Sequence, residues 1–450
     1  MCLEDDAYTD YYTAFATGEL RATPPTVLCS VPLKHIIQEN GKFCGFRFHS
    51  YLCRCRTGMV ITMQKGNRIN SERIKEARLF RKMTIAELAE SVGINKQAIS
   101  QFENNKTTPE PLTLRKISEA LDFPYSFFLE YDKPSTIGNT YFRALYSSKK
   151  KDLVAQKIRA KYLVKIHSVL STKVRFKPLN LPVFTDGEQL SIEEIAQRVR
   201  TYWDLGDAPI PNMVSLLEKN GIIVGEFATG SRDIDAFYQY YEENNCSTYC
   251  VILGADKKSF FRRQFNCAHE LGHIILHERY SDLNEIDREE FRERENEANA
   301  FAAALLLPAT AFGADAAIYP NRLSHYVALK QKWCVSAMAM ILRAYSLGYI
   351  TSNQYSYLMR QMSMNGYRQK EPLDDVIEYK HPVALKQAIN LLMTKGNMTS
   401  QDIIALFAAN KFSVSPDVVE ELLNLEIGTL TTYKEPSKII EFPAIQKAEE

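Results

Sequence analysis

The sequence has no run of about 18 apolar residues, the length that a membrane-spanning helix needs. Its first ten residues, MCLEDDAYTD, are acidic, whereas a secretory signal peptide begins with basic and then apolar residues. The formal net charge is only +1 at pH 7, so no overall field directs the chain to nucleic acid or to a membrane surface. These absences predict a cytoplasmic protein with no membrane partner, in which any DNA contact depends on a local surface.

Cysteine usage points to the same compartment. The 450 residues include nine cysteines, an odd number in a long chain without secretory features. This usage predicts reduced thiols in a cytoplasm better than a disulfide framework. Because 450 residues exceed one ordinary hydrophobic core, we expect two to three folded domains.

Capping signals divide residues 71–129 into a run of short helices. Thr84, with Glu87 three residues later, forms a capping-box pattern, and Gly93 ends that helix where a left-handed turn is needed. Asn95 then caps a second helix. Such a pair presents the polar face of its second helix to the major groove of DNA, where glutamine pairs with adenine and lysine with guanine. The side chains predicted to contact DNA are Lys96, Gln97, Ser100, Gln101, Asn105 and Lys106.

Two interpretations of this half of the chain stay open. The helical pattern also fits a plain bundle with a solvated polar face. Residues 141–177 hold eleven lysines or arginines and a single acid, Asp152, and predict a basic helix followed by a proline-containing linker. That helix either adds phosphate contacts or is solvated between two domains.

The stretch FNCAHELGHIILH, residues 265–277, spaces its histidines four residues apart. His269 and His273 therefore face one side of a helix and can hold one Zn²⁺ ion, with Zn–N bonds of about 2.0–2.1 Å. Glu270 lies about 100° round the helix, beside the metal, where a general base belongs. His277 lies roughly 12 Å along the axis from His269, too far to share the ion. The alternative is a structural helix that happens to carry histidines.

A site of this kind needs a third ligand, typically a glutamate on a following helix. Residues 292–308, RERENEANAFAAALLLP, predict such a helix, with an apolar face that would pack against the first. Glu295 is the predicted ligand, with Glu297 as the alternative. Asn299, one turn after Glu295, is predicted to orient the ligands from the same face.

Two stretches resemble known families. TIAELAESVGINKQAISQFENNKTTPEPLTLRKISEAL resembles the phage-repressor type (XRE) helix-turn-helix along its whole length. RRQFNCAHELGHIILH with ENEANAFAAALLLP resembles the ImmA/IrrE family of metallopeptidases. The likeness extends back through YWDLGDAPIPNMVSLLEKNGIIV and forward through WCVSAMAMILRAYSLGYIT, so both resemblances together cover residues 68 to about 372.

The first resemblance implies binding to a double-stranded DNA operator, usually as a homodimer. The second implies a zinc-dependent endopeptidase of mobile elements and stress responses, which relieves repression by cleaving a repressor. Carried onto this sequence, the metal ligands would be His269, His273 and Glu295, and the general base Glu270. The segment GSRDIDAFYQYYEENN, residues 230–245, departs from the family pattern because no obvious histidine is present to stabilise an oxyanion. Tyr238 or Tyr241 is the candidate for that role.

The predicted fold is mainly α with a small mixed α+β metallopeptidase domain. It combines an N-terminal repressor-type five-helix domain, a zincin-like (gluzincin) catalytic domain and a helical C-terminal region. The expected organisation is a poorly patterned extension over 1–66, the DNA-binding domain over 67–132, a basic helical linker over 133–182, the zinc metallopeptidase domain over 183–372 and a small helical region over 373–450.

Three functions fit these features. The first is a DNA-binding regulatory metallo-endopeptidase that cleaves a repressor. The second is a transcriptional regulator whose peptidase-like domain senses a ligand or metal without proteolysis. A third is an antitoxin-like partner of a protein encoded nearby. The intact HELGH motif favours the first, since a sensor need not retain Glu270.

Overall fold

A computed structural model describes most of the chain from residue 69 to residue 431. The described segments are 69–131, 150–184, 189–229, 235–243, 246–256, 259–277 and 287–431, with the backbone of three further strands. Contacts divide the chain into two units, Met1–Gly66 and Asn67–Glu450. The predicted extension over 1–66 lies outside the described residues except for two short antiparallel strands, β1 (Cys53–Arg54) and β2 (Val60–Ile61).

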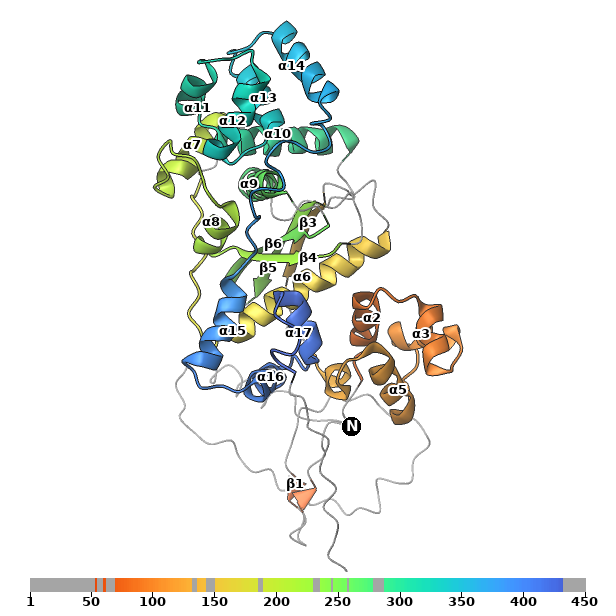
Figure 1. Cartoon of the computed structure of the whole chain (residues 1–450). Helices are drawn as coiled ribbons and strands as arrows, with labels where there is room; N and C mark the ends of the chain where they lie inside the picture. Colours follow the sequence, from red (N-terminus) through yellow and green to blue (C-terminus); the bar gives the residue numbers. More distant parts are fainter. Residues whose placement is uncertain are drawn as a thin grey trace, which may run out of the picture. The chain divides into compact units, whose positions relative to one another are not determined.

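The second unit begins with the predicted repressor-type domain, which has four α-helices and one 3₁₀ helix (Figure 1). The capping signals work as the sequence predicts: the Thr84 side chain accepts from the Glu87 amide at 3.1 Å, and the Glu87 carboxylate accepts from the Thr84 amide. Gly93 has φ of 75°, the left-handed conformation that lets the chain turn into the next helix. The elements are α2 (Ser71–Phe80), α3 (Ile85–Val92), α4 (Lys96–Glu103), α5 (Pro111–Leu121) and η2 (Tyr125–Leu129).

A buried ion pair fixes α4 against α2. Arg78 donates to both oxygens of Glu103, at 2.6 and 2.8 Å, and its remaining nitrogen donates to the Met83 carbonyl at 2.8 Å. All of these donors and acceptors are satisfied inside the domain, so the pair sets the position of the last turn of α4.

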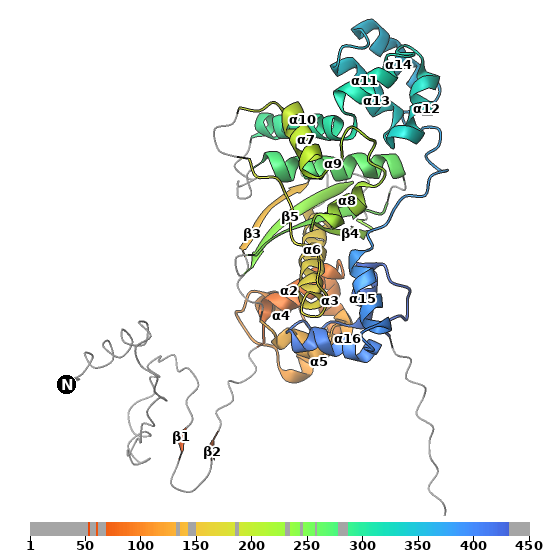
Figure 2. The same cartoon turned by 90° about the vertical axis from the view of Figure 1, so that its left-hand side faces the viewer.

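A four-stranded sheet forms the centre of the α+β part. Its order is β3-β5-β6-β4, in which only β4 and β6 run parallel. Helix α6 lies on one side of this sheet and α9 on the other (Figure 2). The strands are β3 (Thr136–Phe142), β4 (Ile223–Phe227), β5 (Ala236–Glu243) and β6 (Cys246–Gly254); α6 is Lys150–Leu170 and α9 is Phe260–Leu276.

Residues 133–182, predicted to form a basic helical linker, do contain a helix, α6, but this helix packs into a hydrophobic core and is not a solvated connection. Residues 136–142 pair with β5 as an edge strand of the sheet, and α6 carries a buried apolar face that includes Ala155, Tyr162 and Ile166. Among its lysines, Lys161 forms an ion pair with Glu76 of α2. The many basic residues obscured the apolar positions between them, and these positions pack α6 between the sheet and the repressor-type domain.

The remaining helices fall into two groups. The C-terminal helices share one hydrophobic core with α2–α6, where Arg81 contacts Asp417 at 2.9 Å and Glu130 accepts from Ser413. The others share a second core with α9. The first group is α15 (Ala384–Thr394), α16 (Ser400–Ala409) and α17 (Pro416–Leu423); the second is α7 (Ile192–Tyr202), α8 (Met213–Lys219), α10 (Arg288–Leu306), α11 (Ala309–Ala316), α12 (Leu323–Trp333), α13 (Ala337–Ser346) and α14 (Ser352–Met364).

Within the described residues, no single helix is both long and apolar enough to cross a membrane. Helices α10 and α11 reach that length and composition only when they are taken together across a 75° bend.

We predict that Gly272→Val will destabilise the protein by about 1–3 kcal/mol, as overpacking does in close-packed cores. A Cβ at Gly272 of α9 would lie 3.1 Å from the Ala298 Cα and 3.2 Å from the Ala298 carbonyl oxygen of α10. Denaturant unfolding of the full-length protein measures the loss. The matched control is Ala300→Val, a β-branched substitution at an exposed position of α10. An equal effect of both substitutions would show that the helix contact at Gly272 is not tight.

Candidate metal centre and helix-turn-helix surface

Helix α9 is held on the sheet by both apolar and polar contacts. Cys267, Ala268 and Leu271 are fully buried between α9 and its neighbours. Near the start of the helix, Gln264 accepts from the Met213 amide at 2.6 Å and donates to the Ile210 carbonyl at 2.8 Å, just before α8. Arg263 forms a buried ion pair at 2.7 Å with Glu226 of β4. These contacts fix the rotation of α9, and therefore the direction in which its histidines point.

Three predicted ligands converge between α9 and α10. The Nε2 atoms of His269 and His273 are 3.0 Å apart. Glu295 places one carboxylate oxygen 3.1 Å from His273 Nε2 and the other 3.5 Å from His269 Nε2. Among the described residues, these three form the one cluster of at least three potential ligands whose atoms lie within 4.8 Å of one another.

The donor set fits a tetrahedral cation. With metal–nitrogen bonds of about 2.0–2.1 Å, the corners of a tetrahedron are about 3.3 Å apart, close to the separations among His269, His273 and Glu295. Two imidazole nitrogens and a carboxylate turn their lone pairs toward one point, an arrangement that a positive charge at that point stabilises. Both histidines are buried, so bulk water screens the site little.

The ionisation states suit metal binding. Burial lowers the pKa of His273 to about 4, although the hydrogen bond that His273 donates to Glu295 opposes the shift. Burial acts to raise the pKa of Glu295, but hydrogen bonds and charge from His269 and His273 outweigh it and hold that pKa well below its usual range. At neutral pH, His273 is therefore neutral and Glu295 ionised, the forms in which both donate electron pairs to a metal.

Of the other four residues predicted for this site, three lie on the same side of the sheet as α9 and one lies on the opposite side. Glu270 is buried on α9 next to His269, and Asn299 is half-buried on α10 one turn after Glu295. The Tyr238 ring of β5 stacks on the His273 ring, with centroids 6.3 Å apart. Tyr241 is excluded: three residues further along the strand it faces the α6 side of the sheet, where its hydroxyl donates to Gln239 at 2.7 Å.

The structure also separates the two glutamates that the sequence left as alternatives. Glu297 accepts from His277 at 3.0 Å, and the His277 Nδ1 in turn lies 2.9 Å from the Nδ1 of His273. Of the two glutamates, Glu295 therefore converges with His269 and His273, and Glu297 does not. Burial lowers the pKa of His277, while Glu297 opposes that shift. The spacing of His277 from His273 hinted at this contact, but its link to Glu297 depends on how the two helices pack.

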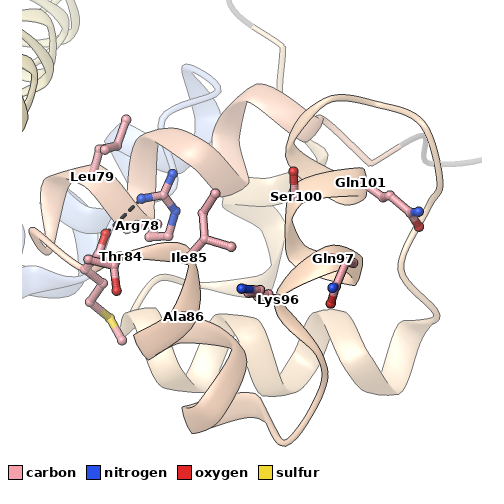
Figure 3. Close-up of a pocket in the computed structure, with 10 residues that line it drawn as sticks. Arg78, Leu79, Thr84, Ile85, Ala86, Lys96, Gln97, Ser100 and Gln101 are labelled. Atoms are coloured by element: carbon pink, nitrogen blue, oxygen red, sulfur yellow. Dashed lines mark hydrogen bonds between the residues drawn. The ribbon is translucent and has the colours of Figure 1, made fainter.

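The helix-turn-helix has an open hollow of about 780 Å³ along the predicted DNA-contacting face of α4. Figure 3 shows Lys96, Gln97, Ser100 and Gln101 on α4, across the hollow from the start of α3. Lys96, Gln97 and Gln101 are exposed, as are Asn105 and Lys106 in the following turn. Asn105 has φ of 55°, a left-handed conformation that asparagine tolerates better than most residues. Four of the six side chains predicted to contact DNA thus line one hollow, and the other two, Asn105 and Lys106, are exposed in the turn that follows α4.

Both the helix-turn-helix segment and the segment with the candidate metal centre match known family models. Residues 71–130 match the family model described as a helix-turn-helix domain, and residues 217–345 match the peptidase M78 model described as an IrrE N-terminal-like domain. The chain thus joins a segment similar to helix-turn-helix domains to a segment similar to the IrrE-like peptidase domain. The IrrE-like match contains all three converging ligands, and the helix-turn-helix match contains the whole of α4.

Parts of the chain are similar to curated proteins that are named as helix-turn-helix regulators. The chain is 32% identical over 74 residues to the HTH-type transcriptional regulator SutR of Escherichia coli (strain K12), covering 16% of this chain and 42% of that protein. It is 40% identical over 55 residues to the HTH-type transcriptional repressor RghR of Bacillus subtilis (strain 168), covering 12% of this chain and 41% of that protein. The chain thus spans about two fifths of the length of these relatives.

A comparison with solved structures returns Bacillus thuringiensis PlcR in complex with the peptide PapR7 and DNA. The alignment covers 67% of this chain and 98% of that chain at 13% identity, with a TM-score of 0.13. A TM-score this low carries no information about the fold of this chain.

We predict that His269→Ala and His273→Ala will each abolish stoichiometric metal binding by the IrrE-like domain, because two ligands alone leave a solvated and weak site. Elemental analysis after dialysis against a low concentration of Zn²⁺ measures the metal content, and circular dichroism checks the fold. The control is His325→Ala on α12, which removes a histidine outside the cluster. Full metal content in either ligand variant would contradict the assignment.

Proposed function

We propose that this protein is a DNA-binding regulatory zinc metallo-endopeptidase that relieves transcriptional repression by cleaving a repressor. The observation that carries the proposal is the convergence of His269, His273 and Glu295 around one point, with Glu270 buried beside them. This donor set, two histidines and one glutamate, is that of catalytic zinc sites that keep a fourth position for water or substrate.

In this proposal zinc is held by His269, His273 and Glu295, and when bound it supplies a Lewis acid for attack on a peptide carbonyl. Glu270 takes a proton from the attacking water and returns it to the leaving amine. A carboxylate in this position favours proton transfer because it is withdrawn from bulk water, being 2% exposed.

The surrounding residues have supporting roles. The Tyr238 ring packs on His273, which makes its phenol the candidate to stabilise negative charge on the substrate carbonyl oxygen. Asn299 is proposed to orient the ligands from α10. The substrate segment would have to approach the point between α9 and α10 from solvent, and Glu295 is the ligand nearest to solvent there, with 13% of its side chain exposed.

The helix-turn-helix would bring this activity to an operator. Lys96, Gln97, Ser100 and Gln101 are proposed to contact base edges in the major groove, and Asn105 and Lys106 to contact phosphates. We further propose that the protein binds as a homodimer, as two-fold symmetric operators require, and that it acts in the cytoplasm, where its operator and repressor would lie.

The second candidate function is a sensor that regulates transcription without proteolysis. Two observations favour it, and the first is that the helix-turn-helix, α6 and the sheet share a hydrophobic core. In addition, Lys82 of the helix-turn-helix and Gln156 of α6 both donate to the Thr229 carbonyl, at 3.2 and 3.3 Å, just after β4. A ligand or metal that shifted the sheet would therefore act directly on the DNA-binding helices.

Glu270→Gln separates these two functions. If the proposal is right, the variant will keep its zinc but lose about 10²–10⁴-fold in cleavage rate, since the amide cannot accept the proton. Cleavage is measured by electrophoresis and mass spectrometry after each protein is incubated with any repressor that is encoded beside its gene. Absence of cleavage by the wild type under inducing conditions, with zinc and operator binding intact, would favour the sensor.

For the DNA-binding surface, we predict that Gln97→Ala will weaken binding to a selected operator by about 1–3 kcal/mol, since one bidentate base contact is lost. Lys106→Ala will weaken binding to all sequences and reduce its salt dependence by about one counterion. Fluorescence anisotropy on DNA selected from a random pool measures both. Arg360→Ala, an exposed change on α14, is the control and should leave binding unchanged.

A further inference from the structure

A chain of hydrogen bonds leads away from the candidate metal centre, beginning at Nδ1 of His273, the ring nitrogen that does not face Glu295. His273 Nδ1 lies 2.9 Å from His277 Nδ1, and His277 Nε2 lies 3.0 Å from a carboxylate oxygen of Glu297. His273 belongs to α9, His277 is the residue that caps its end, and Glu297 comes from α10. The His277 side chain is nearly buried, with 5% of its surface exposed, whereas Glu297 is half-exposed.

Metal binding permits only one assignment of protons along this chain. A metal on Nε2 of His273 leaves the ring proton on Nδ1, which must donate. The nearest group, Nδ1 of His277, must then accept, so the proton of neutral His277 is on Nε2. That atom faces Glu297, whose carboxylate can only accept. Every donor in the chain meets an acceptor, and the opposite tautomer of His273 would turn a proton toward the metal.

The other histidine ligand lacks this support. Nδ1 of His269 is buried and has no hydrogen-bond partner among the described residues. The orientation of His273 is thus controlled by polar contacts that His269 does not share. Glu297 and Glu295 sit two residues apart on the same helix, so α10 contacts His273 on both of its ring nitrogens, once directly and once through His277.

We propose that His277 and Glu297 are positioning residues that hold His273 in its metal-binding tautomer and orientation. The negative charge of Glu297, transmitted through His277, increases the electron density on the His273 ring and strengthens its bond to the metal. This inference rests on the proposed metal centre and not on proteolysis, so it stands whether the protein is an enzyme or a metal sensor.

The competing explanation is structural, in which His277 and Glu297 only close the end of α9 against α10. Three variants of the full-length protein separate the two explanations. His277→Leu removes both hydrogen bonds but retains an apolar side chain. His277→Asn places an amide oxygen near the position of Nδ1, so it can still accept from His273. Glu297→Gln still accepts from His277 but carries no charge. Glu293→Gln, an exposed change one turn earlier on α10, is the matched control.

The measurement is Zn²⁺ affinity by competition with a chromophoric chelator, together with the visible spectrum of the Co²⁺-substituted protein and the melting temperature of the metal-free protein. His277→Leu should weaken Zn²⁺ binding by about 10- to 100-fold and alter the Co²⁺ bands. His277→Asn should recover part of the loss, and Glu297→Gln should show a smaller loss. Glu293→Gln should match the wild type. The metal-free melting temperatures should not follow this order.

Wild-type Zn²⁺ affinity in His277→Leu would overturn the inference, as would a loss in affinity that simply follows the metal-free melting temperature. If the wild type binds no Zn²⁺, both this inference and the proposed metal centre are wrong. If it binds Zn²⁺ but cleaves no repressor, only the proposed proteolysis fails, and the affinities of the variants still decide the role of His277 and Glu297.

Discussion

The close contact between α9 and α10 is the constraint on which the candidate metal centre depends. At Gly272 the two helices approach so closely that a Cβ atom would lie within van der Waals distance of the Ala298 backbone. His269 and His273 flank this glycine on α9, and Glu295 lies one turn before Ala298 on α10. Because the contact point lies among the ligands, the distance between the helices directly sets the distance between the ligand atoms. A larger distance between α9 and α10 would leave the Glu295 carboxylate out of reach of the His269 and His273 imidazoles.

The sheet sets the rotation of α9 and divides the molecule into two environments. Side chains of β5 alternate between its faces: Tyr238 and Tyr240 pack in the core with α9, and Phe237 and Tyr241 pack in the core with α6. The core that contains α9 surrounds the candidate metal centre. The core that contains α6 also includes the helix-turn-helix and the C-terminal helices, so the helix-turn-helix is packed through α6 onto the opposite face of the sheet from the candidate metal centre. Continuous packing therefore connects the candidate metal centre with the helix-turn-helix through the sheet and α6.

Buried ion pairs connect these layers at a few points. Arg78 with Glu103 fixes α4 within its domain, and Arg263 with Glu226 joins α9 to β4. His381 in the segment before α15 also contacts Glu226, at 2.8 Å, so the connection to the C-terminal helices ends at the same carboxylate. A buried pair of this kind contributes little net stability compared with apolar packing, but it penalises any arrangement that leaves one charge unpaired. The relative placement of the strands and helices is thereby made specific.

The sequence by itself determined the features that depend on local spacing. The capping box at Thr84, the left-handed turn at Gly93 and the one-turn separation of His269 from His273 are properties of single helices or turns, and each is present in the structure. The sequence also favoured Glu295 over Glu297 as the predicted third ligand, because Glu295 lies one turn before Asn299 on the same helix, but it left both glutamates open. Local rules suffice in these cases because the interacting groups lie within a few residues of one another or on one helix face.

Only the tertiary structure decided the features that depend on contacts between distant segments. Which of Tyr238 and Tyr241 faces the metal centre depends on the register of β5 in the sheet, since neighbouring residues point to opposite sides. The pairing of Glu297 with His277 depends on the crossing of α9 and α10, and the burial of α6 depends on surfaces supplied by the sheet and by α2. A periodic pattern shows that a face is apolar, but the partner that covers this face is fixed only when distant segments pack together.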